Sequence, residues 1–133
     1  MTLVATLSAS EDMVMTSTNR MDGVLATLRD LHAALLDRSR QEHERLHGRV
    51  RGTGELLQLV AYGESFAWLR PLSKLMIELD EGETSVTAAR AAIHELLMGE
   101  SEFALRHRDA MQNEPAVVLA HAAVMHSLTP LAA

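Results

Sequence analysis

The chain of 133 residues contains no cysteine, so it has no disulfide framework, no thiolate metal site and no thiol nucleophile. Aromatic residues make up only 3% of it, too few for the stacking platform that binds single-stranded nucleic acid. Basic residues are also scarce, with 12 Lys and Arg against 18 Asp and Glu. The resulting net charge of -6 disfavours attraction to nucleic acid or anionic lipid, and we expect no nucleic-acid partner.

Long apolar runs are missing as well. No stretch approaches the roughly 18 apolar residues that span a bilayer, and Glu11 and Asp12 lie where a secretory signal would be apolar. We therefore expect a cytoplasmic protein without a membrane partner, a location that the lack of cysteine also fits. Lys74 is the only lysine, and this preference for Arg favours a GC-rich bacterial source.

The length and composition predict one domain. Hydrophobic residues make up 47% and charged residues 23%, which is ordinary for a globular protein. Residues 1–19, rich in Ser and Thr and without a sustained helical period, predict a mobile N-terminal arm before a helical bundle domain at residues 20–133. Two interpretations of the arm stay open, a misplaced start among several early Met residues or an arm that swaps onto a neighbour.

Helical periodicity accounts for the rest of the chain. Apolar residues at intervals of three and four predict a buried short helix that ends near Gly63 and longer helices over 22–47, 65–80, 86–112 and 114–128. We expect Gly48 to end the first, Pro71 to start or kink the third and Gly99 to bend the fourth. The expected N-caps are Thr53, Ser65, Thr84 or Ser85, and Asn113. The fold class is therefore all-α, a single-domain bundle of four to five antiparallel helices.

The segment from Gly54 to Glu81 reads GELLQLVAYGESFAWLRPLSKLMIELDE. It resembles a family of small bacterial helical proteins in which a Leu-rich helix precedes a Phe-Ala-Trp-Leu-Arg-Pro-Leu-Ser run, here Phe66 to Ser73. The upstream LHAALLDRSRQEHERLHGRV is similar in kind, so the resemblance covers about residues 24–128. No biochemical function is known for that family, and the resemblance implies a helical fold without an assigned active site.

His43, Glu44 and His47 spell HExxH, a motif in which two His on one helix face bind zinc and Glu activates water. Val50 and Thr53 stand where the extended form of the motif has Gly and His, and the flanking residues are polar. A di-iron bundle would need two Glu-x-x-His pairs, and the chain has one. We interpret the motif as an incidental solvated helix end.

A His-x-x-x-Met spacing occurs three times in the last two predicted helices: His94 with Met98, His107 with Met111, and His121 with Met125. Imidazole and thioether together suit soft ions such as Cu(I), and such a pair can also hold a haem iron. Because the chain has seven His and eight Met and few aromatics, core packing is the simpler interpretation. We expect no cofactor and keep soft-metal binding as the alternative.

Two further groups of residues suggest binding. Arg49 and Arg51 are candidates for an anion site, because the amides of the glycine loop beside them could face a phosphate or carboxylate. Acidic neighbours and the lack of a Gly-Lys-Ser/Thr sequence favour a salt-bridged exposed face instead. Trp68 and Arg70 are residue types that dominate interfaces, but they could equally fill a helix junction and bind loop carbonyls.

The helix over 114–128 is apolar or small around most of its circumference, so it is either central or covered by a second chain through Val117, His121 and Val124. No Ser, Thr or Lys has a base and an orienting group at helix spacing, so we assign no catalytic residue. We expect a non-enzymatic helical bundle that acts through self-association, as a homodimer, or through protein binding. A bundle that holds a small ligand or soft metal is the alternative.

Overall fold

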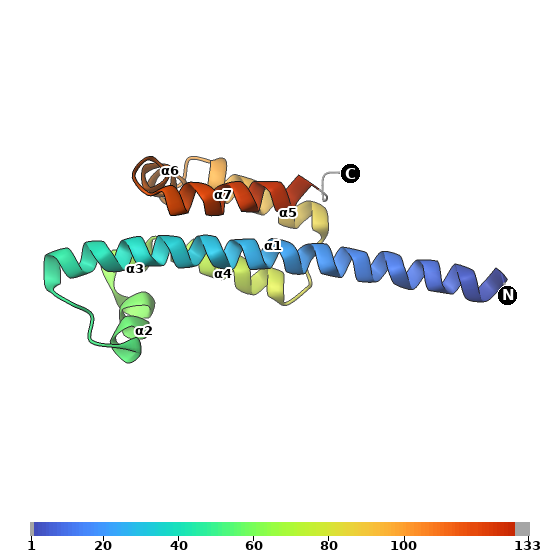
Figure 1. The fold of residues 1–133 in the computed structure, drawn as a ribbon, viewed down its shortest axis with the longest axis horizontal. Coiled ribbons are helices and arrows are strands. Elements are labelled where there is room, and N and C mark those ends of the chain that lie inside the picture. Colours follow the sequence, from blue (N-terminus) through green and yellow to red (C-terminus); the bar gives the residue numbers. More distant parts are fainter. Residues whose placement is uncertain (1, 130–133) are drawn as a thin grey trace.

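In the computed structural model, the backbone is described for residues 2–129 and the side chains for residues 21–129. Every regular element in that range is a helix: α1 (Thr2–His47), α2 (Thr53–Tyr62), α3 (Glu64–Ala67), α4 (Arg70–Asp80), α5 (Val86–Met98), α6 (Glu102–Asn113) and α7 (Pro115–Leu128) (Figure 1). The all-α fold class is confirmed, but the described residues form seven helices rather than four or five. Over those residues, no helix combines the length and the apolar character that crossing a membrane requires.

The longest helix, α1, supplies one wall of the core. Residues at intervals of three and four put a buried stripe on one face of it: Val24, Leu25, Leu28, Leu31 and Leu35. The helix ends at His47 as predicted, and Gly48 follows with φ of 91°, a left-handed conformation that glycine adopts without steric cost. Its start differs, because residues 2–19, predicted as a separate mobile arm, continue α1 beyond the other helices (Figure 1).

The short helix α2 differs most from its prediction. The sequence predicts that its Leu-rich stretch is buried, but α2 contains no buried residue, and Leu57 is 64% exposed. The reason is its position, since α2 makes its main contact with α3 alone. The expected N-cap, Thr53, is instead the first helical residue, and Gly52 before it has no side chain with which to cap.

The predicted helix over 65–80 is divided into α3 and α4 at the proline. Because α4 begins at Arg70, Pro71 lies in its first turn, where a missing N–H removes no helical hydrogen bond. Ser65 is not an N-cap, since α3 already begins at Glu64. The apolar face of α4 is buried as predicted, with Leu72, Leu75 and Leu79 in the core.

The predicted helix over 86–112 is also divided into two. Gly99 ends α5, where a Cβ would clash with the carbonyl oxygen of Glu95. Ser101 then caps α6 by accepting a hydrogen bond of 3.1 Å from the N–H of Ala104. Ser85 caps α5 in the same way, as the sequence predicts. The break therefore needs two features together, a crowded glycine and a new cap two residues later.

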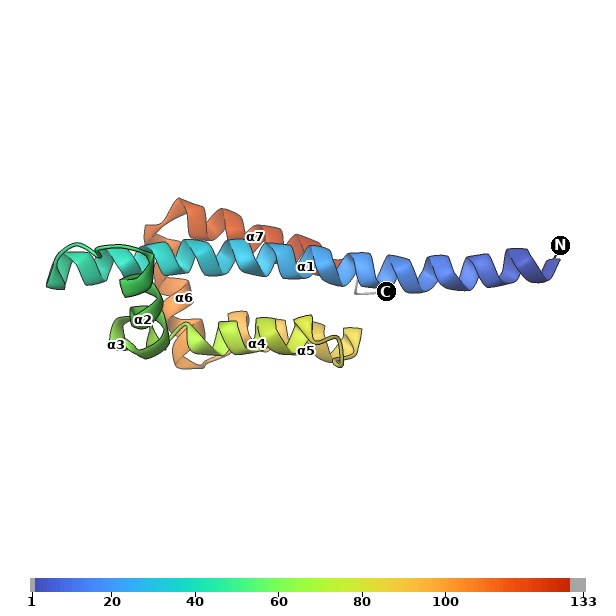
Figure 2. The ribbon, with the colours of Figure 1, turned by 90° about the horizontal axis from the view of Figure 1, so that it is seen from below.

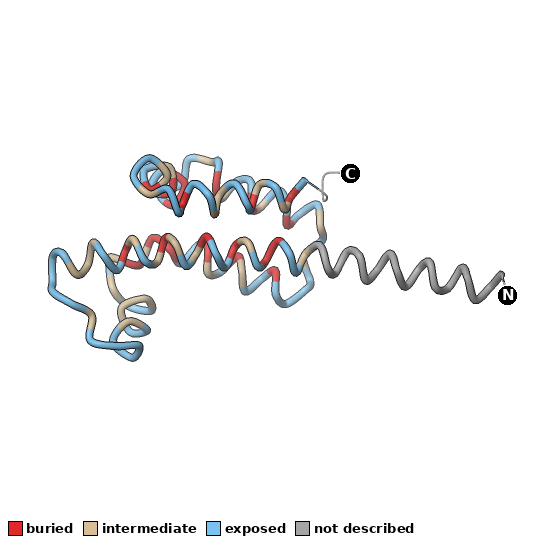
Figure 3. The backbone as a smooth tube through the Cα atoms, viewed as in Figure 1, coloured by how far each residue is buried: buried red, intermediate tan, exposed pale blue. Residues whose placement is uncertain are grey.

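The last helix, α7, begins at Pro115 and ends at Leu128, close to its predicted bounds. Asn113 belongs to α6 and does not cap α7, because Glu114 takes the capping position. α7 has its largest contact with α1, and α4 packs along another side of α1 (Figures 1 and 2). α6 crosses the direction of α1 (Figure 2), and the buried residues gather between these helices (Figure 3).

Candidate functional site

The HExxH residues lie at the carboxyl end of α1. The ring centroids of His43 and His47 are 4.8 Å apart, and the ring of His43 also lies 5.9 Å from that of Phe66. Glu44 accepts a hydrogen bond of 2.9 Å from the N–H of Val50, so its carboxylate closes the loop after α1. Among the described residues, no three His, Asp or Glu side chains lie close enough to hold a metal ion. This geometry favours the interpretation of the motif as a helix end, although Glu44 binds the backbone and is not simply solvated.

The anion candidates Arg49 and Arg51 are exposed in the loop between α1 and α2, where they line an open hollow of about 590 Å³. Two of the backbone N–H groups that an anion would need are bound by the chain's own carboxylates. Glu44 takes the N–H of Val50, and Glu55 takes that of Arg51 at 3.0 Å. These two amides are therefore not available to an anion, and the anion site stays a prediction.

Trp68 and Arg70 take the positions that the structural interpretation predicts. Trp68 is 8% exposed, its ring centroid lies 5.5 Å from that of Phe103, and its Nε1 donates to Ser39 Oγ at 3.0 Å. Arg70 is exposed and donates to the carbonyl oxygen of Ala61 at 2.8 Å. Trp68 is therefore closed to a partner protein, whereas Arg70 remains accessible.

An ion-pair cluster that the sequence analysis missed centres on Arg38 of α1. Its guanidinium lies 3.4 Å from Glu42, 3.3 Å from Asp109 and 3.4 Å from Glu114. Of these three partners, only Glu42 could be predicted from the sequence, because it lies four residues after Arg38 on the same helix face. The other two carboxylates belong to α6 and to the start of α7, so Arg38 links α1 to both of these helices. The three carboxylates neutralise the positive charge of Arg38.

The structure brings together two of the three histidines of the His-x-x-x-Met pattern. His107 Nε2 and His121 Nδ1 are 2.9 Å apart, which joins α6 to α7 through one hydrogen bond. His107 is fully buried and stacks on Phe103 with ring planes 11° apart. Its Nδ1 is buried without a hydrogen-bond partner among the described side chains. One ring must donate and the other accept, so at least one of them is neutral.

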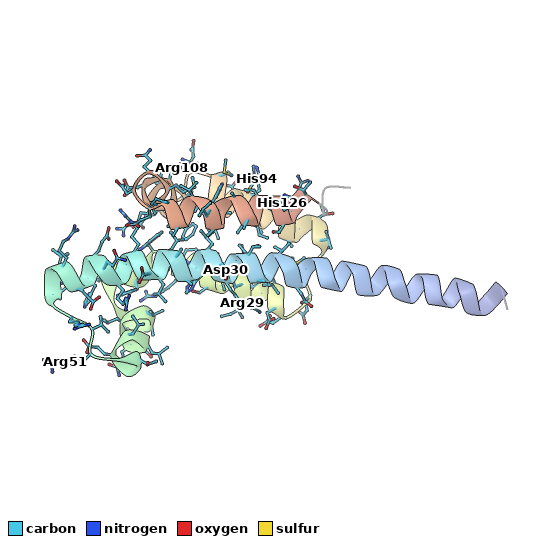
Figure 4. The ribbon with its side chains drawn as sticks, in the orientation of Figure 1. Arg29, Asp30, Arg51, His94, Arg108 and His126 are labelled. Carbon is cyan, nitrogen blue, oxygen red and sulfur yellow. The ribbon has the colours of Figure 1, made fainter. Side chains whose placement is uncertain are left out.

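The remaining members of the His/Met pattern do not join this pair. His94 is exposed on the outer side of α5 (Figure 4), and Met98 is 46% exposed. Met111 and Met125 are half-buried and pack against the core. A histidine pair that already shares a hydrogen bond, beside thioethers engaged in packing, is typical of a core contact rather than of a metal centre.

The histidine pair makes the fold sensitive to acid. Burial, with the charges of His121 and Arg108 adding to it, lowers the pKa of His107 to about 4, and burial also lowers the pKa of His121. The unfolded chain therefore binds a proton before the folded chain does. The contribution of neutral His107 to the free energy of unfolding is therefore complete above pH 6.5, the ordinary pKa of His. It is lost as the pH falls through about 4.

We expect urea unfolding to show a loss of stability between pH 6.5 and about 4 that is steeper in the wild-type protein than in His107→Gln. One titrating group adds at most about 1.4 kcal/mol per pH unit to this slope. The matched control is His94→Gln, which makes the same substitution at an exposed histidine outside the pair. Equal slopes for the wild type and His107→Gln would show that His107 does not titrate in this range.

Two of the three candidate interface residues of α7 are buried. Val117 and Val124 are 0% exposed because one face of α7 packs on α1, but Leu119 on the same helix is 72% exposed, so α7 is not the central helix of one predicted alternative, and its cover by a second chain stays a prediction. His121, the third candidate, is occupied by His107. The large exposed apolar side chains of α7 are Val118 and Leu119, which line an open hollow of about 420 Å³ with Pro115.

α2 carries large apolar residues that the fold leaves uncovered. Leu57 is 64% exposed and Tyr62 84%, and Leu46 at the nearby end of α1 is 70% exposed. The other side of α2 is half-buried, because Leu56, Leu59 and Val60 pack against the edge of the core. The ion pairs between described side chains include neither Arg49 nor Arg51, in the loop that leads into α2.

The fold and these surfaces define an all-α protein with exposed apolar side chains on several helices, α2 and α7 among them. No protein-family model, no curated protein and no solved structure matches the chain. The resemblance to small bacterial helical proteins therefore stays a prediction.

Proposed function

We propose that the protein acts by binding rather than by catalysis, and that its partner is a second copy of the same chain. The observation that carries the proposal is α2, a helix of 10 residues that is rich in Leu and has no buried residue. Isolated helices of this length are marginal in water, and most of their stability comes from packing of an apolar face. A partner surface over α2 would supply the packing that its own chain gives on one side only.

The exposed side chains of α2 suit a protein interface. Full burial of a Leu stabilises by about 1.5 to 3 kcal/mol, and Leu57 has most of its surface available for this. Tyr62 adds a large ring with a polar end, and Tyr is enriched in interface cores. Two-fold dimers are the commonest assemblies of identical chains, which favours a second copy as the partner.

We expect Leu57→Lys to weaken self-association by about tenfold or more, because about 1.4 kcal/mol of lost burial is enough for that change in Kd. Light scattering over a dilution series that starts at about 100 μM, well above micromolar dissociation constants, measures the change in Kd. Leu119→Lys is the matched control, since it makes the same change at an exposed position of α7. Association that survives Leu57→Lys but not Leu119→Lys would contradict the assignment to α2.

A further inference from the structure

The exposed stripe of α4 has its charges sorted by sign. Arg70, Lys74, Glu78 and Glu81 follow one another at intervals of four, four and three residues, so they lie along one side of the helix, and all are exposed. The amino-terminal half of the stripe is basic and the carboxyl-terminal half is acidic. Ile77 lies beside the middle of the stripe and is 61% exposed.

This order of charges does not serve α4 itself. The helix dipole favours acidic residues in the first turn and basic residues in the last, and α4 has neither. Lys74 precedes Glu78 by four residues, which is the weaker orientation for a pair within a helix. The ion pairs between described side chains do not include one between Lys74 and Glu78. Lys74 and Glu78 at the centre of the stripe are therefore open to charges on another molecule, while Arg70 also donates to the carbonyl oxygen of Ala61.

The stripe is complementary to itself when it is reversed. If two copies of α4 lie side by side in opposite directions, Lys74 of each faces Glu78 of the other, and Arg70 of each faces Glu81. A two-fold axis repeats every such contact, so each ion pair forms twice. Parallel pairing would instead place like charges together. We propose that two copies of the chain associate through antiparallel α4 helices, with Ile77 between the ion pairs.

In this proposal α2 of each copy lies at the interface as well, so the inference rests on the proposed function and specifies its interface. α2 and α4 lie on the same side of α1, with α2 near the start of α4 (Figure 1). Antiparallel docking therefore brings the α2 end of one copy to the far end of α4 in the other. The loop before α2 is basic, with Arg49 and Arg51, whereas the turn after α4 is acidic, with Glu81 and Glu83. Opposite charges meet at both ends.

Charge reversal at the centre of the stripe tests the register. Lys74→Glu and Glu78→Lys should each raise the dimer Kd by about tenfold, because each places like charges opposite one another twice. An equimolar mixture of the two variants restores both pairs across a mixed dimer, so its Kd should return to within about threefold of the wild-type value. Sedimentation equilibrium measures all three samples, and circular dichroism checks that each variant is folded.

The outcomes separate this inference from the proposed function. Single variants that weaken the dimer and a mixture that restores it support antiparallel α4 pairing. Variants that leave the dimer intact, or that weaken it without rescue in the mixture, overturn the pairing, while a loss of the dimer in Leu57→Lys still supports association through α2. A wild-type chain that stays monomeric at about 100 μM overturns both.

Discussion

Replacing Trp68 by Ala is expected to lower the free energy of unfolding by about 3 to 5 kcal/mol, the range for truncating a large buried aromatic residue. Trp68 is 8% exposed and packs against Phe103, and its Nε1 donates to Ser39 Oγ at 3.0 Å. Ser39 is itself 1% exposed, so the truncation leaves both a cavity and a buried hydroxyl without its partner. Urea unfolding at neutral pH measures the loss.

Two variants separate packing from hydrogen bonding at this position. Trp68→Phe keeps much of the ring and removes the donor, which should cost about 1 to 3 kcal/mol for the unsatisfied hydroxyl. Adding Ser39→Ala to Trp68→Phe should cost little more, because both partners of the bond are then gone. A loss of less than about 1 kcal/mol in Trp68→Ala would contradict its place in the core and favour its interpretation as an interface residue.

Val124→Asp is expected to destabilise the fold by about 3 to 5 kcal/mol, because it buries a charge that has no partner. Val124 is 0% exposed on α7, the helix with the largest contact to α1. That loss is a large part of the total stability of a domain of this size. Thermal and urea unfolding, followed by circular dichroism, would show it as a lower midpoint or as an unfolded chain.

Leu119→Asp is the matched control for this prediction. It introduces the same side chain in the same helix, but Leu119 is 72% exposed, so the cost should stay near 0.5 kcal/mol, about the usual size for a surface change. Equal costs at the two positions would mean that α7 does not pack on α1 in the way described. A large cost at Leu119 alone would place the buried face of α7 on its other side.

Sequence patterns predicted the features of this fold that depend on neighbouring residues. Gly48 ends α1 because a left-handed residue closes a helix, and Pro71 falls in a first turn because only there is its missing N–H harmless. Ser85 caps α5 for an equally local reason. The buried faces of α1 and α4 follow from intervals of three and four residues.

The features that the sequence did not predict depend on residues far apart in the chain. Periodicity shows that α2 is apolar. It does not show that the short helix α3 makes nearly all of the contact with α2, which leaves α2 without a buried residue. The hydrogen bond from His107 to His121 depends on how α6 meets α7, and within each helix only the spacing to Met was visible. Arg38 similarly meets Asp109, which is 71 residues away. Gly99 was predicted to bend a helix, and that the backbone at Gly99 leaves no room for a Cβ beside the carbonyl oxygen of Glu95 could not be seen from propensity.

Self-association is the central claim, and the molecular mass of the unmodified chain in solution tests it most directly. One chain has a mass of 14.6 kDa. We predict that sedimentation equilibrium at about 100 μM gives twice this mass, and that the average mass falls toward that of one chain as the protein is diluted through its Kd. A mass of 14.6 kDa at every concentration up to about 100 μM would contradict the account.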